Sequence, residues 1–403
     1  MTTKEEMTTK NAMLAFAVSK AGETEGRVVE LPIPEPDRNY ALIRVLYAGV
    51  CNTDLEILQG YMGFQGVLGH EFVGRVESIA SDDDLLKTKL IGKRVCGDIN
   101  VGCADCDVCH DICGLNSCGC SQMSRNHCPN RTVLGILNKN GTMAEYLTLP
   151  ISNLHVVPDN MPNEVAVFSE PLAAACRIVE QGLIFYKSSD ASYLRRKPDR
   201  VAILGDGKLG LMIAEVLGRE HMRQFKEHND NGNDGDNKNI PPPPILFGKH
   251  KHKMDLVLSS GVKSKHVSEC QDDSRFDGVH KDHSGRYDVV VDATGSPAGL
   301  KIASGLCRPM GTLVLKSTCA AGDTFNAAPF VINELKVVGS RCGPINKALE
   351  ILSFTKSDLS ISPGNIPLDV KKYVTQIFPL SQADEAIKLA AEKSTMKVLI
   401  DCT

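Results

Sequence analysis

The chain has 403 residues, 42% of them hydrophobic, and a formal net charge of −4, so it is long enough for two domains. The charge is close to neutral and no long run of Lys or Arg occurs, which argues against a nucleic-acid partner. There is no apolar secretory segment at the N-terminus and no stretch near the about 20 apolar residues of a membrane helix, so we expect a cytoplasmic protein without a membrane partner.

Two kinds of sequence follow one another along the chain. Residues 13–150 contain short β-branched and apolar runs broken by Gly and Pro, such as "YALIRVLYAGV" and "HEFVGRVESI", which predict a β-rich, largely antiparallel unit. After a helical segment at 164–185, strand-like runs alternate with helix-length segments, the pattern of a doubly wound parallel sheet. These runs lie at 201–204, 244–248, 287–295, 311–318 and 335–340. The last strand-like run, 395–402, is expected to return to the first domain.

Two polar segments resemble insertions. Residues 220–244 have little apolar content and end in four prolines, so they predict a disordered, solvent-exposed loop. Residues 265–286 are a weaker example of the same kind, and neither segment is expected to carry chemistry.

A glycine motif predicts a dinucleotide site. Gly205, Gly207 and Gly210 have the spacing G-x-G-x-x-G, with a predicted strand before them and a predicted helix after them. Gly205 would permit the tight turn, Gly207 would let the backbone approach a pyrophosphate, and Gly210 would let helix and strand pack closely. A glycine-rich turn without a ligand is the alternative.

The end of the next predicted strand indicates which dinucleotide binds. An Asp or Glu at this position binds the ribose 2′-hydroxyl of NAD. Here the position falls on Gly248, and Lys249 and His250 follow it. Cations without a carboxylate suit the 2′-phosphate of NADP, so we expect NADP(H) to be favoured over NAD(H). A solvated basic turn that tolerates NAD is the alternative.

A histidine and a glutamate, His70 and Glu71, lie side by side in an apolar run, where charged groups need partners. A thiolate, an imidazole and a carboxylate can hold zinc and leave one position open for catalysis. We therefore expect a catalytic zinc on Cys51, His70 and one of two glutamates, Glu71 or Glu170. A buried Cys and His that bind no metal are the alternative.

A second group of potential ligands lies between residues 103 and 128, which include seven of the fifteen cysteines. Cys103, Cys106 and Cys109 have the C-x2-C-x2-C spacing of a structural zinc site. The fourth ligand is open, with candidates Cys113, Cys118, Cys120 and Cys128, and His110 and His127 as less favoured ones. An iron–sulfur cluster is the rival interpretation.

Taken together, these features resemble the zinc-containing medium-chain dehydrogenase/reductase family, which includes alcohol, sorbitol and threonine dehydrogenases. The resemblance covers nearly the whole chain and includes "AGVCNTDLEI", "LGHEFVGRV", "EPLAAACRI", "GDGKLG", "DATGSP" and "GSRCG". It implies an α/β protein with a GroES-like β-rich catalytic domain plus a Rossmann doubly wound parallel-sheet cofactor domain. We place the first domain at 1–165 with 343–403 and the second at 166–342. The resemblance also implies a homodimer or homotetramer.

The resemblance assigns ligands to both zinc sites. The corresponding residues are Cys51, His70, Glu71 and Glu170 for catalytic zinc, and Cys103, Cys106, Cys109 and Cys128 for structural zinc. "EPLA" resembles the polyol and threonine branch. Two departures stand out: 18 residues separate Cys109 from Cys128, more than is usual in the family, and Glu56 replaces the family's proton-relay histidine.

The expected reaction is reversible oxidation of an alcohol to a carbonyl, with hydride transfer to nicotinamide and zinc as the Lewis acid. Thr53 is a candidate to take the proton from the substrate oxygen, or else a turn-stabilising hydroxyl. Asp54 would orient a zinc ligand or cap a helix. The alternatives are an inactive NADP-binding sensor or scaffold, a zinc-free quinone reductase, and a thiol redox switch that uses the extra cysteines.

Overall fold

The protein forms two compact units. The computed structural model describes residues 12–20, 25–110, 123–184, 199–230, 242–275, 277–317, 326–355 and 366–403. The first unit takes its residues from 1–170 and 373–403, and the second from 171–372. The second unit extends beyond the predicted boundary at residue 342 and includes α10 (Ile345–Ser353), an amphipathic helix with four buried residues, Ile345, Ala348, Leu349 and Leu352. No helix of the described residues is both long and apolar enough to cross a membrane.

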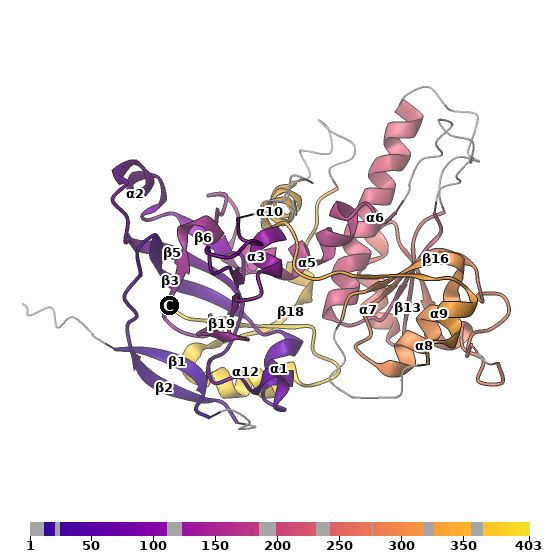
Figure 1. Cartoon of the computed structure of the whole chain (residues 1–403), viewed down its shortest axis with the longest axis horizontal. Coiled ribbons are helices and arrows are strands. Elements are labelled where there is room, and N and C mark those ends of the chain that lie inside the picture. The colour runs from indigo at the N-terminus through magenta and orange to yellow at the C-terminus, as the bar shows by residue number, and fades with distance from the viewer. Residues whose placement is uncertain are drawn as a thin grey trace, which may run out of the picture. The chain divides into compact units, whose positions relative to one another are not determined.

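The first unit consists mainly of antiparallel strands. Its largest sheet has the order β11-β6-β5-β3-β19-β18, with β10 paired to β3. These strands are β3 (Tyr40–Gly49), β5 (Glu71–Ile79), β6 (Arg94–Gly97), β10 (Tyr146–Pro150), β11 (Leu154–Val156), β18 (Val374–Pro379) and β19 (Lys397–Asp401). The last strand, β19, belongs to the first unit, as the sequence predicts. It pairs with β3, although their residues are far apart in the chain (Figure 1).

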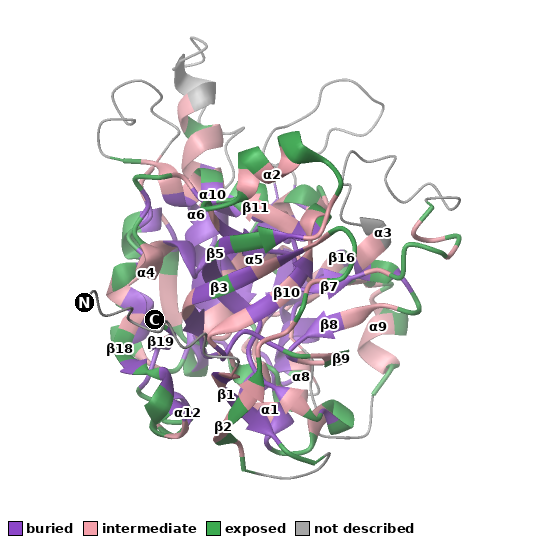
Figure 2. Cartoon of the chain, turned by 90° about the vertical axis from the view of Figure 1, so that its left-hand side faces the viewer, coloured by how far each residue is buried: buried purple, intermediate pink, exposed green. Residues whose placement is uncertain are grey.

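Two smaller sheets complete the strands of this unit. One has the order β2-β1-β4 and the other β7-β8-β9. Their strands are β1 (Ala12–Val18), β2 (Arg27–Pro32), β4 (Gly66–Val67), β7 (Asn100–Val101), β8 (Thr132–Leu134) and β9 (Asn138–Lys139). Apolar residues of β1 and β4 pack in one core cluster. In Figure 2 the central strands β3 and β5 contain many buried residues mixed with partly buried and exposed ones, and each has a strand on both sides in the sheet.

Short helices connect these strands. They are α1 (Asn52–Ile57), α2 (Asp84–Leu90), α3 (Met123–His127), α4 (Asn163–Ala166) and α12 (Ala383–Ala390). Helix α5 (Ser169–Glu180) begins with the last residues of the first unit and continues in the second. Helix α1 matters most for the site, because it begins immediately after Cys51.

The second unit contains one parallel sheet with the order β14-β13-β12-β15-β16-β17. Its strands are β12 (Val201–Leu204), β13 (Ile245–Gly248), β14 (Lys263–His266), β15 (Tyr287–Asp292), β16 (Cys307–Leu315) and β17 (Lys336–Gly339). Counted along the chain this order is 3-2-1-4-5-6, that of a dinucleotide-binding sheet. Ligands of such sheets bind at the carboxyl ends of the strands where the order reverses, here beside β12.

Apolar residues of the central strands explain why this sheet forms. Every residue of β12 is buried, as are most residues of β15, because a parallel sheet has both faces covered. The remaining helices of this unit are α6 (Lys208–Asp230), α7 (Lys251–Asp255), α8 (Pro297–Leu306) and α9 (Ala328–Ile332). Helix α6 packs against β12, and α8 packs against β15 and β16.

A carboxylate with two arginine partners joins the beginnings of three segments of this unit. Asp288 accepts hydrogen bonds from the Arg200 backbone N–H at 2.8 Å, from Arg200 Nε at 3.0 Å and from Arg308 Nε at 2.6 Å. Burial alone would raise the pKa of Asp288, but these partners outweigh burial and lower its pKa. The carboxylate is therefore more stable as an anion in the folded chain than in an unfolded one.

The two predicted insertions are more ordered than the sequence indicates. Residues 220–230 extend α6 instead of beginning a loop, a correction that has a local cause. The Glu220 carboxylate accepts hydrogen bonds from Arg223 and Gln224, three and four residues along the helix. Residues 231–241 lie outside the described residues. The second segment contributes buried Val267, Cys270 and Val279 to the core, so it is not merely solvent-exposed.

Candidate active site and metal centres

Three predicted ligands of the catalytic metal lie together in the first unit. The ligand atoms of Cys51, His70 and Glu71 are all within 4.8 Å of one another. Cys51 precedes α1, while His70 and Glu71 lie at the start of β5, which pairs with β3 directly before Cys51. His70 and Glu71 are 3% and 1% exposed. Cys51 is half-buried, so the fold brings together two buried side chains and one that is partly exposed.

Asp54 joins the two segments that carry these residues. Its Oδ2 accepts the backbone N–H of Cys51 at 2.8 Å, and its Oδ1 accepts the backbone N–H of Gly69 at 3.1 Å. Its Oδ1 also lies 3.5 Å from Nδ1 of His70, a buried nitrogen that makes no hydrogen bond of good geometry with the described residues. Asp54 thus has the position of a helix cap and the position of a group that orients His70.

The charges around His70 suit a cation. Burial alone would lower the pKa of His70, but the Cys51 and Asp54 charges together raise it well above its ordinary value. The site therefore attracts positive charge when no metal is present. A thiolate, an imidazole and a carboxylate are also the ligand types that zinc accepts. The donor set and the charge of the site both fit a divalent zinc ion.

Lys397 is a member of the site that our sequence analysis missed. Its ammonium donates to both oxygens of Glu71, at 2.7 and 2.6 Å, and to the carbonyl oxygen of Val50 at 3.3 Å. Burial alone would lower the pKa of Lys397, but the charge of Glu71, followed by that of Cys51, raises it. The signal was a lysine within the apolar run of β19, the same kind of signal that identified His70.

Other predicted residues of this site lie at its periphery. Thr53 is half-buried, and its Oγ1 accepts a long hydrogen bond from the Cys51 thiol at 3.9 Å. Glu170, the second residue of α5, is half-buried and is not one of the three clustered ligands. Glu56 accepts a hydrogen bond from Asn52, and its pKa is raised by burial.

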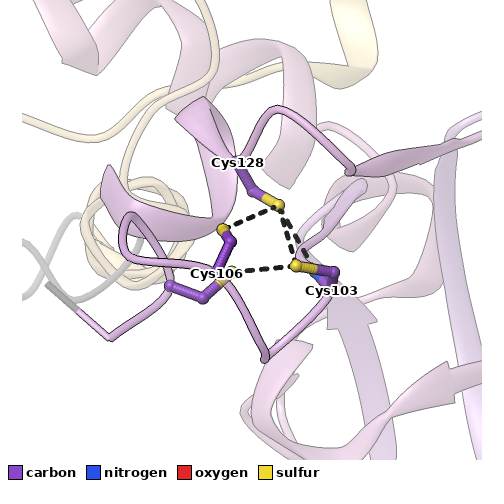
Figure 3. A group of neighbouring side chains, drawn as sticks. Cys103, Cys106 and Cys128 are labelled. Carbon is purple, nitrogen blue, oxygen red and sulfur yellow. Dashed lines mark hydrogen bonds between the residues drawn. The ribbon is translucent and has the colours of Figure 1, made fainter.

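Four cysteines form a second candidate metal centre in the first unit. The sulfur atoms of Cys103, Cys106, Cys109 and Cys128 all lie within 4.8 Å of one another. Three come from the turn after β7, and Cys128 follows α3. Figure 3 shows Cys103, Cys106 and Cys128 pointing toward a common centre. Of the candidates for the fourth ligand, Cys128 is therefore the one that the fold places there.

The sulfur–sulfur distances agree with a single tetrahedral ion. They are 3.5 Å for Cys103–Cys128, 3.7 Å for Cys106–Cys128 and 4.0 Å for Cys103–Cys109. Zinc–sulfur bonds of about 2.3 Å give a tetrahedron with edges of about 3.8 Å. The thiolates of a four-iron cluster bind four different irons and lie farther apart. The geometry therefore favours one ion over a multi-iron cluster.

The remaining ligand candidates of this segment differ in position. His110 and His127 are exposed and do not belong to the cluster. Cys113, Cys118 and Cys120 lie outside the described residues. Within the cluster, a backbone hydrogen bond from Asp105 lowers the pKa of Cys103 to about 6, whereas burial raises the pKa of Cys109 to about 12.

The glycine motif lies at the carboxyl end of β12, in the second unit. Gly205 has φ +111°, which a tight left-handed turn requires. A Cβ on Gly210 would lie 2.0 Å from the carbonyl oxygen of Gly205, so helix and strand could not approach as closely with any other residue. A Cβ on Gly207 would meet no atom within 4 Å. Gly207 thus borders open space at the place where a pyrophosphate was predicted.

An aspartate lies at the end of β13, where the sequence lacks an acid. Asp206, from the glycine turn, accepts the backbone N–H groups of Lys249 and His250 at 2.8 and 2.6 Å, and its Oδ2 lies 3.0 Å from His250 Nδ1. Lys249 is exposed and His250 is half-buried. The sequence gives no sign of this contact, because it joins residues about forty positions apart through the sheet.

Comparisons with known families agree with this arrangement. Residues 37–159 match the alcohol dehydrogenase GroES-like domain, and residues 244–357 match the zinc-binding dehydrogenase domain. The first match contains Cys51, His70 and the four clustered cysteines. The second begins just before β13 and extends through α10.

Related proteins match over almost the full chain. D-altritol 5-dehydrogenase of Agrobacterium fabrum is 27% identical over 389 residues, which cover 93% of this chain and 96% of that protein. A zinc-binding dehydrogenase structure from Sinorhizobium meliloti 1021, bound to NADP, has a TM-score of 0.71 at 24% identity, covering 97% and 100% of the two chains. An Escherichia coli CFT073 alcohol dehydrogenase structure with NADH has a TM-score of 0.72 at 22% identity, covering 97% and 99%.

Proposed function

Because the chain belongs to the zinc-containing medium-chain dehydrogenase/reductase family, it is an oxidoreductase of the alcohol dehydrogenase type, and we propose that its substrate is a polyol. The reaction would interconvert a hydroxyl group of the polyol and the corresponding carbonyl with a nicotinamide dinucleotide. The observation that carries the proposal is the convergence of Cys51, His70 and Glu71. The "EPLA" motif and the D-altritol relative favour a polyol over a simple alcohol.

We assign the catalytic zinc to Cys51 and His70 with one carboxylate. A zinc ion there would supply Lewis-acid polarisation of the substrate oxygen. Two glutamates compete for the role of acidic ligand. Glu71 is close enough, but both its oxygens already accept hydrogen bonds from Lys397. Glu170 is the other candidate, and zinc content of Glu71→Gln and Glu170→Gln variants would distinguish them.

The surrounding residues have supporting roles in this proposal. Asp54 orients the His70 ring and fixes the backbone of Cys51, which keeps both donors aimed at one point. Lys397 neutralises Glu71 within the protein interior. The Thr53 hydroxyl lies next to the Cys51 sulfur and is the proposed acceptor of the substrate proton.

The second metal centre has a structural role in this proposal. Four thiolates fill all positions of a tetrahedral zinc ion and leave none for a substrate. The cluster lies in a segment with short strands and a short helix, where a bound ion would replace the missing hydrophobic core.

We propose that the second unit binds the dinucleotide at Gly205, Gly207 and Gly210. The open space beside Gly207 supports this role, because a backbone free of side chains admits a pyrophosphate. Lys249 and His250 are the residues that favoured NADP(H) in the sequence. Asp206, which contacts both residues, adds a negative charge beside them.

We propose that β17 forms a contact between two copies of the chain. It is the edge strand of the parallel sheet, so one side of its backbone pairs with no strand of the described residues. Nearby apolar side chains are unusually exposed: Val331 and Ile332 by 73% and Val337 by 47%. A second copy that pairs along this edge would cover them. A cytoplasmic location stays a prediction, with which the described cysteines agree, since none of them is in a disulfide.

One experiment tests the proposed function directly. Zinc-quantified protein is assayed with a panel of sugar alcohols, simple alcohols and threonine, with NAD and NADP as cofactors. We expect wild-type protein to turn over at least one polyol. The Cys51→Ser variant should lose this activity and should contain one zinc ion fewer per chain. The matched control is Cys342→Ser, a half-buried cysteine of the second unit. Cofactor and zinc binding without turnover of any substrate would favour the sensor alternative.

A further inference from the structure

We propose that Asp206 selects the cofactor, by supplying from the glycine turn the carboxylate that the end of β13 lacks, and that the enzyme therefore prefers NAD(H). This inference rests on the proposed function, since it assumes a nicotinamide dinucleotide at this edge of the sheet. It reverses the preference that the sequence indicated.

The Asp206 side chain occupies the space of the missing residue. A Cβ built on Gly248 would lie 2.6 Å from Asp206 Cβ and 2.8 Å from both Cγ and Oδ2. The carboxylate thus lies where a side chain at position 248 would begin. An acid on position 248 is the residue that binds a ribose in this fold. Because Gly248 has no side chain, it leaves room for Asp206. The negative charge that an acid at position 248 would supply is therefore still present, on Asp206.

The two carboxylate oxygens have different surroundings. Oδ2 accepts the backbone N–H groups of Lys249 and His250, and His250 Nδ1 lies 3.0 Å from it. Oδ1 makes no hydrogen bond with any described residue, although the side chain is only 11% exposed. One oxygen therefore fixes the side chain, while the other is available to a ligand. A ribose 2′-hydroxyl is a donor that a carboxylate oxygen accepts well.

The same contacts disfavour a 2′-phosphate. The two backbone N–H groups that could bind its oxygens already donate to Asp206, and so does the nearest cationic candidate, the imidazole of His250. A phosphate placed here would also face the negative carboxylate at short range. Only the exposed Lys249 side chain remains to favour it, as a flexible and well-hydrated charge.

Binding measurements on the zinc-loaded full chain test this inference without need of a substrate. NADH and NADPH are titrated by nicotinamide fluorescence, and 5′-AMP and 2′,5′-ADP serve as competitors that differ only in the 2′ group. We expect wild-type protein to bind NADH about tenfold or more tighter than NADPH, with the same order for the two competitors. Asp206→Asn should weaken NADH binding and reduce the preference for NADH over NADPH about tenfold, because it removes the charge of the side chain and keeps its shape.

Two further variants give the comparison its controls. Asp255→Asn removes an acid on neighbouring α7 that pairs with exposed Lys251, and it should leave both affinities unchanged. Lys249→Ala removes the exposed charge that remains to favour a 2′-phosphate, so it should weaken NADPH binding and raise the preference for NADH. Thermal melting of each variant identifies any loss of fold, and Asp206→Ser provides a smaller neutral replacement if Asp206→Asn does not fold.

The outcomes separate this inference from the proposed function. A wild-type preference for NADPH that Lys249→Ala abolishes would overturn the role of Asp206 and leave the dehydrogenase assignment intact. An unchanged NADH/NADPH ratio in folded Asp206→Asn would overturn it as well. Failure of wild-type protein to bind either dinucleotide would refute the proposed function itself, and this inference with it.

Discussion

The buried pair of Lys397 and Glu71 permits a demanding test of the first site. We predict that Lys397→Met destabilises the protein by about 3–5 kcal/mol, the usual cost of leaving one member of a buried ion pair without its partner. The two residues are 4% and 1% exposed, so water cannot replace the lost ammonium. The Cys51 and Asp54 charges nearby add to the repulsion that the remaining carboxylate meets.

A second variant distinguishes the charge from the packing of the side chain. The double variant Lys397→Met with Glu71→Gln leaves no net charge, and replacement of a whole buried pair by neutral groups is often close to neutral in stability. We therefore expect it to recover more than half of the loss. The matched control is Lys347→Met, whose partner Glu350 is about half exposed, and a surface pair of this kind contributes about 0–1 kcal/mol.

The assay is urea denaturation followed by far-ultraviolet circular dichroism, with zinc content measured on the same samples. A loss of less than about 1 kcal/mol in Lys397→Met would contradict this prediction, because a buried carboxylate without a partner destabilises a protein by more than that. A double variant that is no more stable than the single one would contradict it as well, since the loss would then come from packing.

Three further predictions concern the other parts of the chain. Cys128→Ser should lower zinc by one ion per chain in mass-spectrometric analysis, whereas Cys342→Ser should not; equal zinc in both would remove Cys128 from the cluster. Gly207→Ala should weaken dinucleotide binding about tenfold and leave the free energy of unfolding almost unchanged. Gly210→Ala should destabilise the fold by about 1–3 kcal/mol, because its Cβ would meet a backbone oxygen; cofactor titration and urea denaturation of both variants check these results. Asp288→Asn should lower the free energy of unfolding by about 1 kcal/mol at pH 7 and by less below about pH 4, because a carboxylate with a lowered pKa stops stabilising the fold once it is protonated. An equal loss at pH 3 and pH 7, measured by urea denaturation, would contradict this.

Local pattern determined much of what could be predicted. Strand β12 begins and ends where its apolar run does, and the glycine spacing after it marks the turn, because both signals depend on neighbouring residues. The cysteine spacing indicated three ligands of a metal centre for the same reason. The fourth, Cys128, could not be chosen by spacing alone, because a long segment separates it from Cys109. The fold made the choice by placing α3 beside the turn.

The contacts that the sequence did not reveal join distant segments. Lys397 is 326 residues from Glu71 and reaches it through the pairing of β19 with β3. Asp206 reaches the end of β13 because β12 and β13 are neighbours in a parallel sheet. An absent acid at position 248 therefore said nothing about the charge in that part of space. The residue at a motif position predicts the charge of a binding site only when no residue that the fold places beside it supplies the same group.

Asp54 and Asp206 use the same physical device in separate units. Each carboxylate accepts two backbone N–H groups, Asp54 from two separate segments and Asp206 from the turn after β13. Each also faces a histidine that sequence analysis had placed in a binding site. Backbone donors cannot change rotamer, so they hold the carboxylate in one place at little further cost in entropy. Each histidine then has a fixed negative neighbour. At Asp206 one oxygen accepts both N–H groups, so a neutral amide would keep this acceptor but not the charge, and Asp206→Asn should alter ligand binding more than folding. At Asp54 each oxygen accepts one N–H group, so Asp54→Asn loses an acceptor and should also cost stability.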